Sequence, residues 1–211
     1  MKLTTFPPFL GDEKAVASVI NTKMPFIAVY PWQEKDLVVL GRSSHEIPDV
    51  NIEACNKHGI GIVRRKCGGG VVLLTEGIWI ITAAYPLPAN NIVDIPQVLD
   101  DIVLVIGKVL EQFYGKEFSL QGMGDLTIND KKIIGSSLYH GKGLVMYQGS
   151  LLVQAELKKI SRYLGKQSKE PAYRMGRKHD EFITNLGLPA ETDFLPVAEK
   201  LAKVLLEFTP R

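Results

Sequence analysis

The chain has 211 residues, 45% of them hydrophobic, and a formal net charge of +2. This length and composition fit a single folded domain with a sizeable core, and the small net charge argues against a general nucleic-acid binder. The longest apolar runs are too short to span a bilayer, and no signal-like apolar segment opens the chain. We therefore expect a cytoplasmic protein with neither a membrane nor a nucleic-acid partner.

Hydrophobic periodicity divides the chain into helices and strands. The clearest helix covers residues 95–113, where apolar residues recur with helical spacing over about five turns, and Gly115 is expected to end it. Asp49 is expected to cap a short helix that Gly59 ends. The other expected helices are 12–22, 50–58, 155–164 and 197–208, and the expected strands are 26–30, 36–40, 60–63, 71–74, 78–85, 118–121, 125–128, 131–138 and 144–153.

This mixture of hairpins and long helices predicts an α+β fold with a mixed, largely antiparallel sheet that helices cover on one side. One hairpin is expected to turn at Asn129-Asp130. Strict alternation along its second strand would place Lys132, Ile134 and Ser136 together on one face of the sheet.

A glycine-rich segment between two predicted strands is the strongest candidate for a binding site. Residues 64–72 read Arg-Arg-Lys-Cys-Gly-Gly-Gly-Val-Val. Three glycines leave the backbone without Cβ atoms, so another molecule can approach it closely. Backbone N–H groups flanked by three cations can hold a phosphate or a carboxylate. An ordinary hairpin turn with solvated cations fits the same pattern.

The predicted hairpin brings together an acid and a base. Asp125 precedes it, and Lys132 follows its turn. The two side chains could face one ligand, with the lysine on a phosphate and the aspartate on a divalent cation or on ribose-like hydroxyls. A surface ion pair is the alternative. The two cysteines, Cys55 and Cys67, are too few for a disulfide framework and offer no metal site.

Several motifs together resemble the lipoate–protein ligase A family, in the family's order from residue 36 to residue 187. The glycine segment resembles Arg-Arg-x-Ser-Gly-Gly-Gly-Ala-Val, and the hairpin resembles Asn-Asp-Leu…Lys-Ile-x-Gly-Ser-Ala. Further similar segments are Val39-Leu40-Gly41-Arg42, Gln148-Gly149-Ser150-Leu151-Leu152, and Tyr173-Arg174…His179…Phe182…Thr184-Asn185-Leu186.

The resemblance implies the biotin/lipoate ligase catalytic fold, related to class II aminoacyl-tRNA synthetases, as a single domain over residues 1–211 without the accessory C-terminal domain of longer ligases. It implies that lipoate or octanoate reacts with ATP, helped by Mg²⁺, to give acyl-AMP. The acyl group then passes to a lysine of a lipoyl-acceptor domain, of the glycine-cleavage H type or the 2-oxoacid dehydrogenase E2 type. A separate small accessory subunit is a further candidate partner.

The resemblance also implies roles for individual residues. Lys132 is the expected catalytic residue, stabilising negative charge on phosphate and carbonyl oxygens. Asp125 would position the adenylate or bind Mg²⁺. The expected ligands of ATP and lipoyl-AMP are Arg64, Arg65, Lys66, Gly68, Gly69, Gly70, Val71, Val72, Asp125 and Lys132, and the expected acyl pocket is formed by Cys67, Leu74, Ile134, Gly135, Ser137, Gln148 and Gly149.

The chain departs from the family motifs where polar partners of the ligand are expected. The residues at these positions are Cys67, Leu74, Thr75, Ile78, Gly124 and Gln148. Two alternatives therefore stand beside the ligase. One is an ATP-independent octanoyl- or lipoyl-transferase that uses a cysteine thioester, for which Cys67 beside the cations is the better candidate. The other is a non-catalytic homologue that binds lipoyl-AMP.

Overall fold

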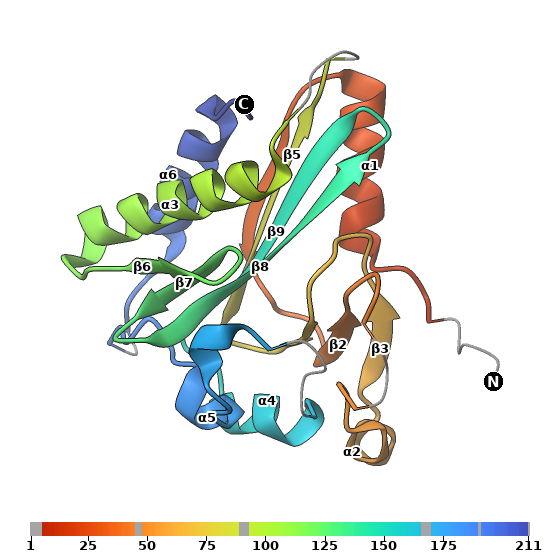
Figure 1. Cartoon of the computed structure of the whole chain (residues 1–211), viewed down its shortest axis with the longest axis vertical. Helices are drawn as coiled ribbons and strands as arrows, with labels where there is room; N and C mark the ends of the chain where they lie inside the picture. The colour runs from red at the N-terminus through yellow and green to blue at the C-terminus, as the bar shows by residue number, and fades with distance from the viewer. Residues whose placement is uncertain (1–5, 45–47, 89–92, 166–169, 190, 211) are drawn as a thin grey trace.

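Two β-sheets form the frame of the protein, and helices pack on them (Figure 1). The computed structural model describes residues 6–44, 48–88, 93–165, 170–189 and 191–210. The strands are β1 (Phe26–Pro31), β2 (Leu37–Leu40), β3 (Gly61–Arg64), β4 (Val71–Leu74), β5 (Ile78–Pro86), β6 (Ser119–Gln121), β7 (Asp125–Ile128), β8 (Lys131–Gly141) and β9 (Leu144–Leu152), and the helices are α1 (Leu10–Thr22), α2 (Ile52–His58), α3 (Ile95–Tyr114), α4 (Leu157–Tyr163), the 3-10 turn η1 (Ala172–Arg174), α5 (His179–Phe182) and α6 (Leu195–Glu207).

The large sheet has six strands in the order β1-β5-β9-β8-β7-β6, all antiparallel to their neighbours. The small sheet has the order β3-β2-β4, in which β2 runs parallel to β3 and antiparallel to β4. The predicted α+β architecture with a mixed, largely antiparallel sheet is therefore confirmed. Within the described ranges, no helix has the length and apolar character needed to cross a membrane.

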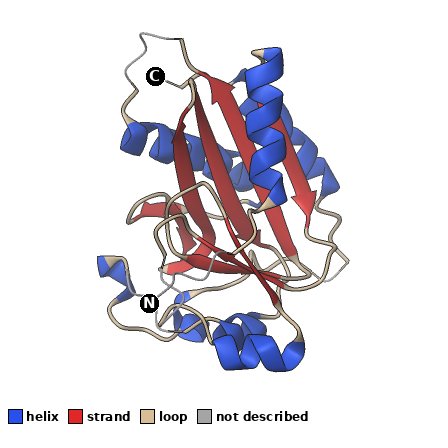
Figure 2. Ribbon diagram, turned by 90° about the vertical axis from the view of Figure 1, so that its right-hand side faces the viewer, coloured by secondary structure: helices blue, strands red, loops and turns tan. Residues whose placement is uncertain are grey.

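Helices cover both faces of the large sheet, so the prediction of a sheet covered on one side is wrong (Figure 2). Ile81, Ala83 and Tyr85 of β5 belong to the core cluster under α3 and α6. Ala84 of the same strand packs in another cluster with Val16 of α1. Successive strand residues point to opposite faces, and both sets are apolar here because both faces are covered.

The long helix α3 confirms the clearest sequence prediction. Asp94 caps it, with the Asp94 carboxylate accepting a hydrogen bond of 3.2 Å from the backbone N–H of Gln97. Gly115 ends it in the left-handed conformation, as expected. The cap predicted for α2 is wrong: the side chain of Asn51, and not that of Asp49, accepts from the N–H of Ala54 at 3.1 Å.

A β-bulge decides which face of the sheet carries Lys132. Leu126 of β7 pairs with Ile134 of β8, but the next residue, Thr127, pairs with Lys132, so Ile133 is an extra residue in β8. Ile133 and Ile134 are both fully buried in the core cluster under α3. The bulge cancels the expected alternation, so the prediction that Lys132 shares a face with Ile134 and Ser136 is wrong.

Candidate active site

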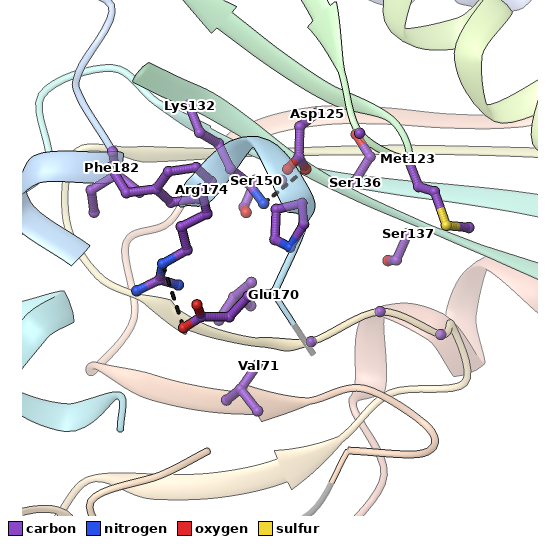
Figure 3. Close-up of a pocket in the computed structure, with 18 of the residues that line it drawn as sticks. Val71, Met123, Asp125, Lys132, Ser136, Ser137, Ser150, Glu170, Arg174 and Phe182 are labelled. Atoms are coloured by element: carbon purple, nitrogen blue, oxygen red, sulfur yellow. Dashed lines mark ion pairs between the residues drawn. The ribbon is translucent and has the colours of Figure 1, made fainter. Parts of the chain in front are cut away.

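A cavity of about 740 Å³ is lined by residues of both sheets and by the segment 170–182 (Figure 3). The glycine segment, β4, β8 and α5 contribute to its wall. A cavity of this size can enclose most of a small organic ligand. Several apolar side chains line it together with a few charged ones; the apolar ones include Val71, Leu73, Ile78, Leu152, Ile160, Leu164, Phe182 and Ile183.

The glycine loop, residues 65–70, is fixed through its carbonyl groups. The N–H of Gly41 donates to the carbonyl of Gly70 at 3.1 Å, and the hydroxyl of Ser44 donates to that of Gly69 at 3.0 Å. A Cβ atom on Gly41 would lie 2.1 Å from the carbonyl oxygen of Gly69. Only glycine permits this close approach. In the described parts of the chain the N–H groups of Gly69 and Gly70 donate no hydrogen bond, which leaves them for a ligand.

The three cations before the glycines have different surroundings. The Arg65 guanidinium is buried and donates to the carbonyls of Gly68, at 3.0 and 3.2 Å, and of Gly70, at 3.2 Å. Arg64 donates to backbone carbonyls of the segment after β2, and Lys66 forms an ion pair of 2.7 Å with Glu13 of α1. Of the three, only Arg65 lines the cavity. The expected attraction of phosphates by all three stays a prediction.

Lys132 and Asp125 meet in the cavity wall. Lys132 Nζ lies 2.8 Å from Asp125 Oδ1, and the Asp125 side chain is only 8% exposed. Lys132 shares its face with Gly135, because a Cβ on Gly135 would lie 2.9 Å from Lys132 Cε. The hydroxyl of Tyr173 donates to the other carboxylate oxygen, Asp125 Oδ2, at 2.8 Å. Burial, and then Asp125, raise the pKa of Tyr173, so its hydroxyl keeps its proton.

These contacts bear on the expected Mg²⁺. Both oxygens of Asp125 already have partners, and among the described residues no three His, Cys, Asp or Glu side chains cluster closely enough to hold a metal. The residues present thus do not form a ready magnesium site. A protein that uses Mg²⁺ with a nucleotide usually supplies one or two carboxylates and leaves the other ligands to phosphates and water. The role of Asp125 as a metal ligand stays a prediction.

The segment 170–182, here called the strap, closes the cavity opposite the glycine loop. Arg177 ties it to the β7–β8 turn by donating to the carbonyl of Asp130 at 3.0 Å, and it also donates to the carbonyl of Tyr173 at 2.8 Å. Just beyond the strap, the N–H of Thr184 donates to the carbonyl of Lys132 at 2.9 Å. The strap therefore lies directly on the strand that carries Lys132.

The strap brings three more ionisable side chains to the cavity wall: Glu170, Arg174 and His179. Arg174 Nε lies 3.6 Å from Glu170 Oε1. Burial and the neighbouring cations Arg174 and Lys132 lower the pKa of His179 to about 4, so its imidazole is neutral at pH 7. The sequence prediction assigned no role to these residues or to Tyr173, although it quoted Tyr173, Arg174 and His179 in the last similar segment. That segment was the signal that could have identified them.

The residues expected in the acyl pocket separate into three groups. Gly135 and Ser137 line the main cavity. Gln148 and Gly149 instead line a neighbouring cavity of about 30 Å³, which Gly135 and Ser137 also border. The other three are buried in core clusters and do not line the main cavity: Cys67, Leu74 and Ile134.

Neither cysteine is placed as a nucleophile for a ligand in the cavity. Cys67 is fully buried beneath α1, and its Sγ faces the carbonyl oxygen of Met146 at 3.7 Å. Burial raises the pKa of the Cys67 thiol to about 12, in spite of the nearby Arg65. Cys55 is also fully buried, and neither cysteine lines the main cavity.

Comparison with known proteins shows the family. Residues 12–208 match the profile described as "Lipoyl protein ligase A/B catalytic domain". The chain is 28% identical over 147 residues to the lipoate-protein ligase A of Psychrobacter cryohalolentis, which covers 69% of this chain and 41% of that protein. It is 26% identical over 182 residues to the octanoyltransferase LipM of Lysinibacillus sphaericus, covering 74% of this chain and 64% of that protein. The chain thus spans less than half the length of the first of these relatives.

Solved structures have the same fold. A lipoate-protein ligase A bound with ATP superposes with a TM-score of 0.73 at 21% identity, covering 95% of this chain and 80% of that one. The T. acidophilum protein Ta0514 with bound lipoic acid gives 0.73 at 16% identity, covering 100% and 86%. The bi-partite lipoate protein ligase of Thermoplasma acidophilum, described with its E2 lipoyl domain, gives 0.69 at 18% identity, covering 99% and 84%. Because the profile spans nearly the whole chain and the fold agrees, this protein belongs to the lipoyl protein ligase A/B catalytic domain family.

Proposed function

We propose that the protein is an ATP-dependent lipoate–protein ligase, which forms an acyl-adenylate and transfers the acyl group to a lysine of a lipoyl-acceptor domain. The observation that carries the proposal is the placement of Lys132. Its ammonium group is held by Asp125 at 2.8 Å in the wall of a cavity that also contains the glycine loop and a largely apolar surface. An acyl-adenylate needs these three environments together. Its phosphate needs a cation, the polar group that joins phosphate and acyl chain needs backbone that can approach closely, and its acyl tail needs an apolar slot.

In the first step, a carboxylate oxygen of the acid attacks the α-phosphorus of ATP, and the bond from phosphorus to the bridging oxygen breaks to release pyrophosphate. Lys132 stabilises the negative charge that builds up on the phosphate oxygens, without forming a covalent bond. Asp125 and Tyr173 hold Lys132 in place through the contacts at 2.8 Å. The N–H groups of Gly69 and Gly70 are available to the same oxygens.

In the second step, the neutral amine of the acceptor lysine attacks the carbonyl carbon of the acyl-adenylate. The bond between this carbon and the phosphate oxygen breaks, AMP leaves, and the amine loses a proton. Lys132 stabilises the carbonyl oxygen of the tetrahedral intermediate. The apolar wall around Leu73 and Ile160 would hold the acyl tail.

The known proteins support the substrates and the partner. One solved neighbour contains ATP, one contains lipoic acid, and one is described with its E2 lipoyl domain. We propose the same ligands here, with an acceptor of the E2 or the H type. We also propose that residues 1–211 form one catalytic domain and that a separate small subunit, if required, supplies the accessory function.

The similarity to an octanoyltransferase makes acyl transfer without ATP the second candidate. A thioester at Cys67 would require this thiol to leave the core under α1 and to lose its proton despite a pKa of about 12. The geometry therefore favours the ligase. A non-catalytic homologue would bind lipoyl-AMP but would support neither step.

The test is lipoate-dependent exchange of labelled pyrophosphate into ATP in the presence of Mg²⁺. We expect exchange by the wild type and a loss of roughly 10²- to 10³-fold in Lys132→Ala. Lys131→Ala is the matched control, because Lys131 is the exposed neighbour on the same strand, and it should keep its activity.

Three outcomes would contradict the proposal. Equal activity of Lys132→Ala and the wild type would remove its central residue. No exchange, together with octanoyl transfer from an acyl-protein donor and a trapped thioester at Cys67, would establish the transferase. Tight binding of lipoyl-AMP with neither exchange nor transfer, also after addition of an accessory subunit, would establish the non-catalytic homologue.

A further inference from the structure

The cationic side chains on the cavity wall differ in the partners that they bind. Among the described residues that line the cavity, the cationic side chains are Arg65, Lys132 and Arg174. Arg65 donates to carbonyls of the glycine loop, and Lys132 is paired with Asp125 at 2.8 Å. Arg174 has its carboxylate partner only at 3.6 Å, beyond good hydrogen-bond distance.

Arg174 is nevertheless held firmly in place. It is only 5% exposed, its Nε donates to the carbonyl of Arg177 at 2.9 Å, and its guanidinium carbon lies 5.0 Å above the ring centre of Phe182. Its two terminal nitrogens donate no hydrogen bond to any residue that the structure describes. One side of the guanidinium is therefore fixed by the strap, while the fork suited to planar oxygen pairs is open.

Glu170 is the carboxylate nearest to this fork, and its side chain is 21% exposed. Figure 3 shows the Arg174–Glu170 pair in the same view as the Lys132–Asp125 pair, above the backbone beside Val71. Arg174 and Lys132 both act on the neutral imidazole of His179, which places the two cations at the same end of the cavity. A phosphate at this end of the cavity would meet both cations, and it would compete with the loosely held carboxylate of Glu170 for Arg174.

We propose that Arg174 binds a phosphate group of the nucleotide with its free terminal nitrogens, and that this phosphate displaces Glu170 as the partner of Arg174. The inference rests on the proposed adenylation and names its second phosphate ligand. Lys132 and Arg174 then form the cationic end of the cavity, and Arg65 keeps the structural role in the glycine loop. Glu170 competes with the phosphate for Arg174, so it lowers the affinity for ATP.

Direct binding of ATP, measured by titration calorimetry, and the Michaelis constant for ATP in pyrophosphate exchange test the proposal. The variants are Arg174→Met, which keeps an apolar stem over Phe182, Glu170→Gln, and both together. Arg174→Met should weaken ATP at least about tenfold, as expected for the loss of charge-assisted hydrogen bonds. Glu170→Gln should strengthen ATP binding roughly 1.5-fold to fivefold, because a weak, partly exposed ion pair contributes about that much. Lys178→Met is the matched control, since Lys178 is an exposed cation on the same strap.

The double variant gives the decisive result. If Glu170 acts only by competing for Arg174, Glu170→Gln should have no effect on ATP binding in the Arg174→Met background. Unchanged ATP affinity in Arg174→Met, with wild-type stability, would overturn the assignment of Arg174. An equal gain from Glu170→Gln in both backgrounds would overturn the displacement. A wild type that binds ATP through Arg174 without any exchange would refute the adenylation alone, and a wild type that binds no ATP would refute both.

Discussion

Removal of one hydroxyl tests how far the strap holds Lys132 in position. Tyr173→Phe deletes the hydrogen bond of 2.8 Å to Asp125 Oδ2 and keeps the ring, whose centre lies 5.1 Å from that of Phe182. The Asp125 side chain is only 8% exposed, so water cannot easily replace the lost donor. Asp125 then holds Lys132 without the second contact that fixes its own orientation.

The expected loss of unfolding free energy follows from the kind of hydrogen bond that Tyr173→Phe removes. A hydrogen bond to a charged group is worth about 1.5–3 kcal/mol. Tyr173 itself is partly exposed, so we expect the low end, roughly 1.5 kcal/mol of unfolding free energy. For a chain of this length that corresponds to a decrease of roughly 3–6 °C in the midpoint of thermal unfolding. A disturbance of this size at Lys132 should lower the rate of pyrophosphate exchange about tenfold.

Urea unfolding and pyrophosphate exchange measure the two effects on the same preparation. Tyr30→Phe is the control, because the Tyr30 hydroxyl forms no hydrogen bond with the described residues and does not line the cavity. It should leave both quantities nearly unchanged. If Tyr173→Phe has the stability and the exchange rate of the wild type, the hydroxyl does not position Asp125 and the reasoning is wrong. A loss of stability without a loss of rate would restrict Tyr173 to a structural role.

Two further predictions concern the loop and the buried imidazole. Gly41→Ala should prevent stable folding or lower the thermal midpoint by many degrees, since its Cβ would lie 2.1 Å from the Gly69 carbonyl oxygen. Gly68→Ala is the control, because its Cβ would lie 4.0 Å from the nearest neighbouring atom. This variant should melt at the same temperature as the wild type. Equal midpoints for the two variants in calorimetry would contradict this. The pKa of His179 falls from 6.5 to about 4 on folding, so between these values the unfolded chain binds more protons and the free energy of unfolding decreases as pH is lowered. Urea titrations at pH 7 and pH 5 should show a smaller decrease for His179→Gln than for the wild type, and identical decreases would refute the assignment.

Most helices and strands could be predicted from the sequence because hydrophobic periodicity and end-capping residues are properties of short segments. The apolar stripe of α3 and the left-handed Gly115 that ends it were visible in the sequence. The bulge at Ile133 was not, because it arises from the pairing of β8 with β7 and from burial of two successive isoleucines under α3. Its effect is large, since it moves Lys132 to the other face of the sheet.

The other features of the site that the sequence could not predict are contacts between residues far apart in the chain. Tyr173 lies 48 positions from Asp125, and no periodicity connects them. Lys66 stands beside Arg65 in the chain, but it pairs with Glu13 of α1, while Arg65 turns inward to the glycine loop. The motif identified the region correctly. Only the folded chain shows that adjacent cations have separate tasks.

The bulge in β8 has a consequence for how relatives of this protein are compared. Lys132 and Gly135 are three positions apart, which in a regular strand would put them on opposite faces, yet here they share one. The direction in which this lysine points therefore depends on the bulge as well as on the number of residues between Lys132 and Gly135. In a relative without the bulge, the same spacing would turn the lysine toward the helices, whereas the loss of one residue between the two positions would leave it facing the cavity, as it does here. Counting positions in this short interval is then as informative as finding the lysine itself.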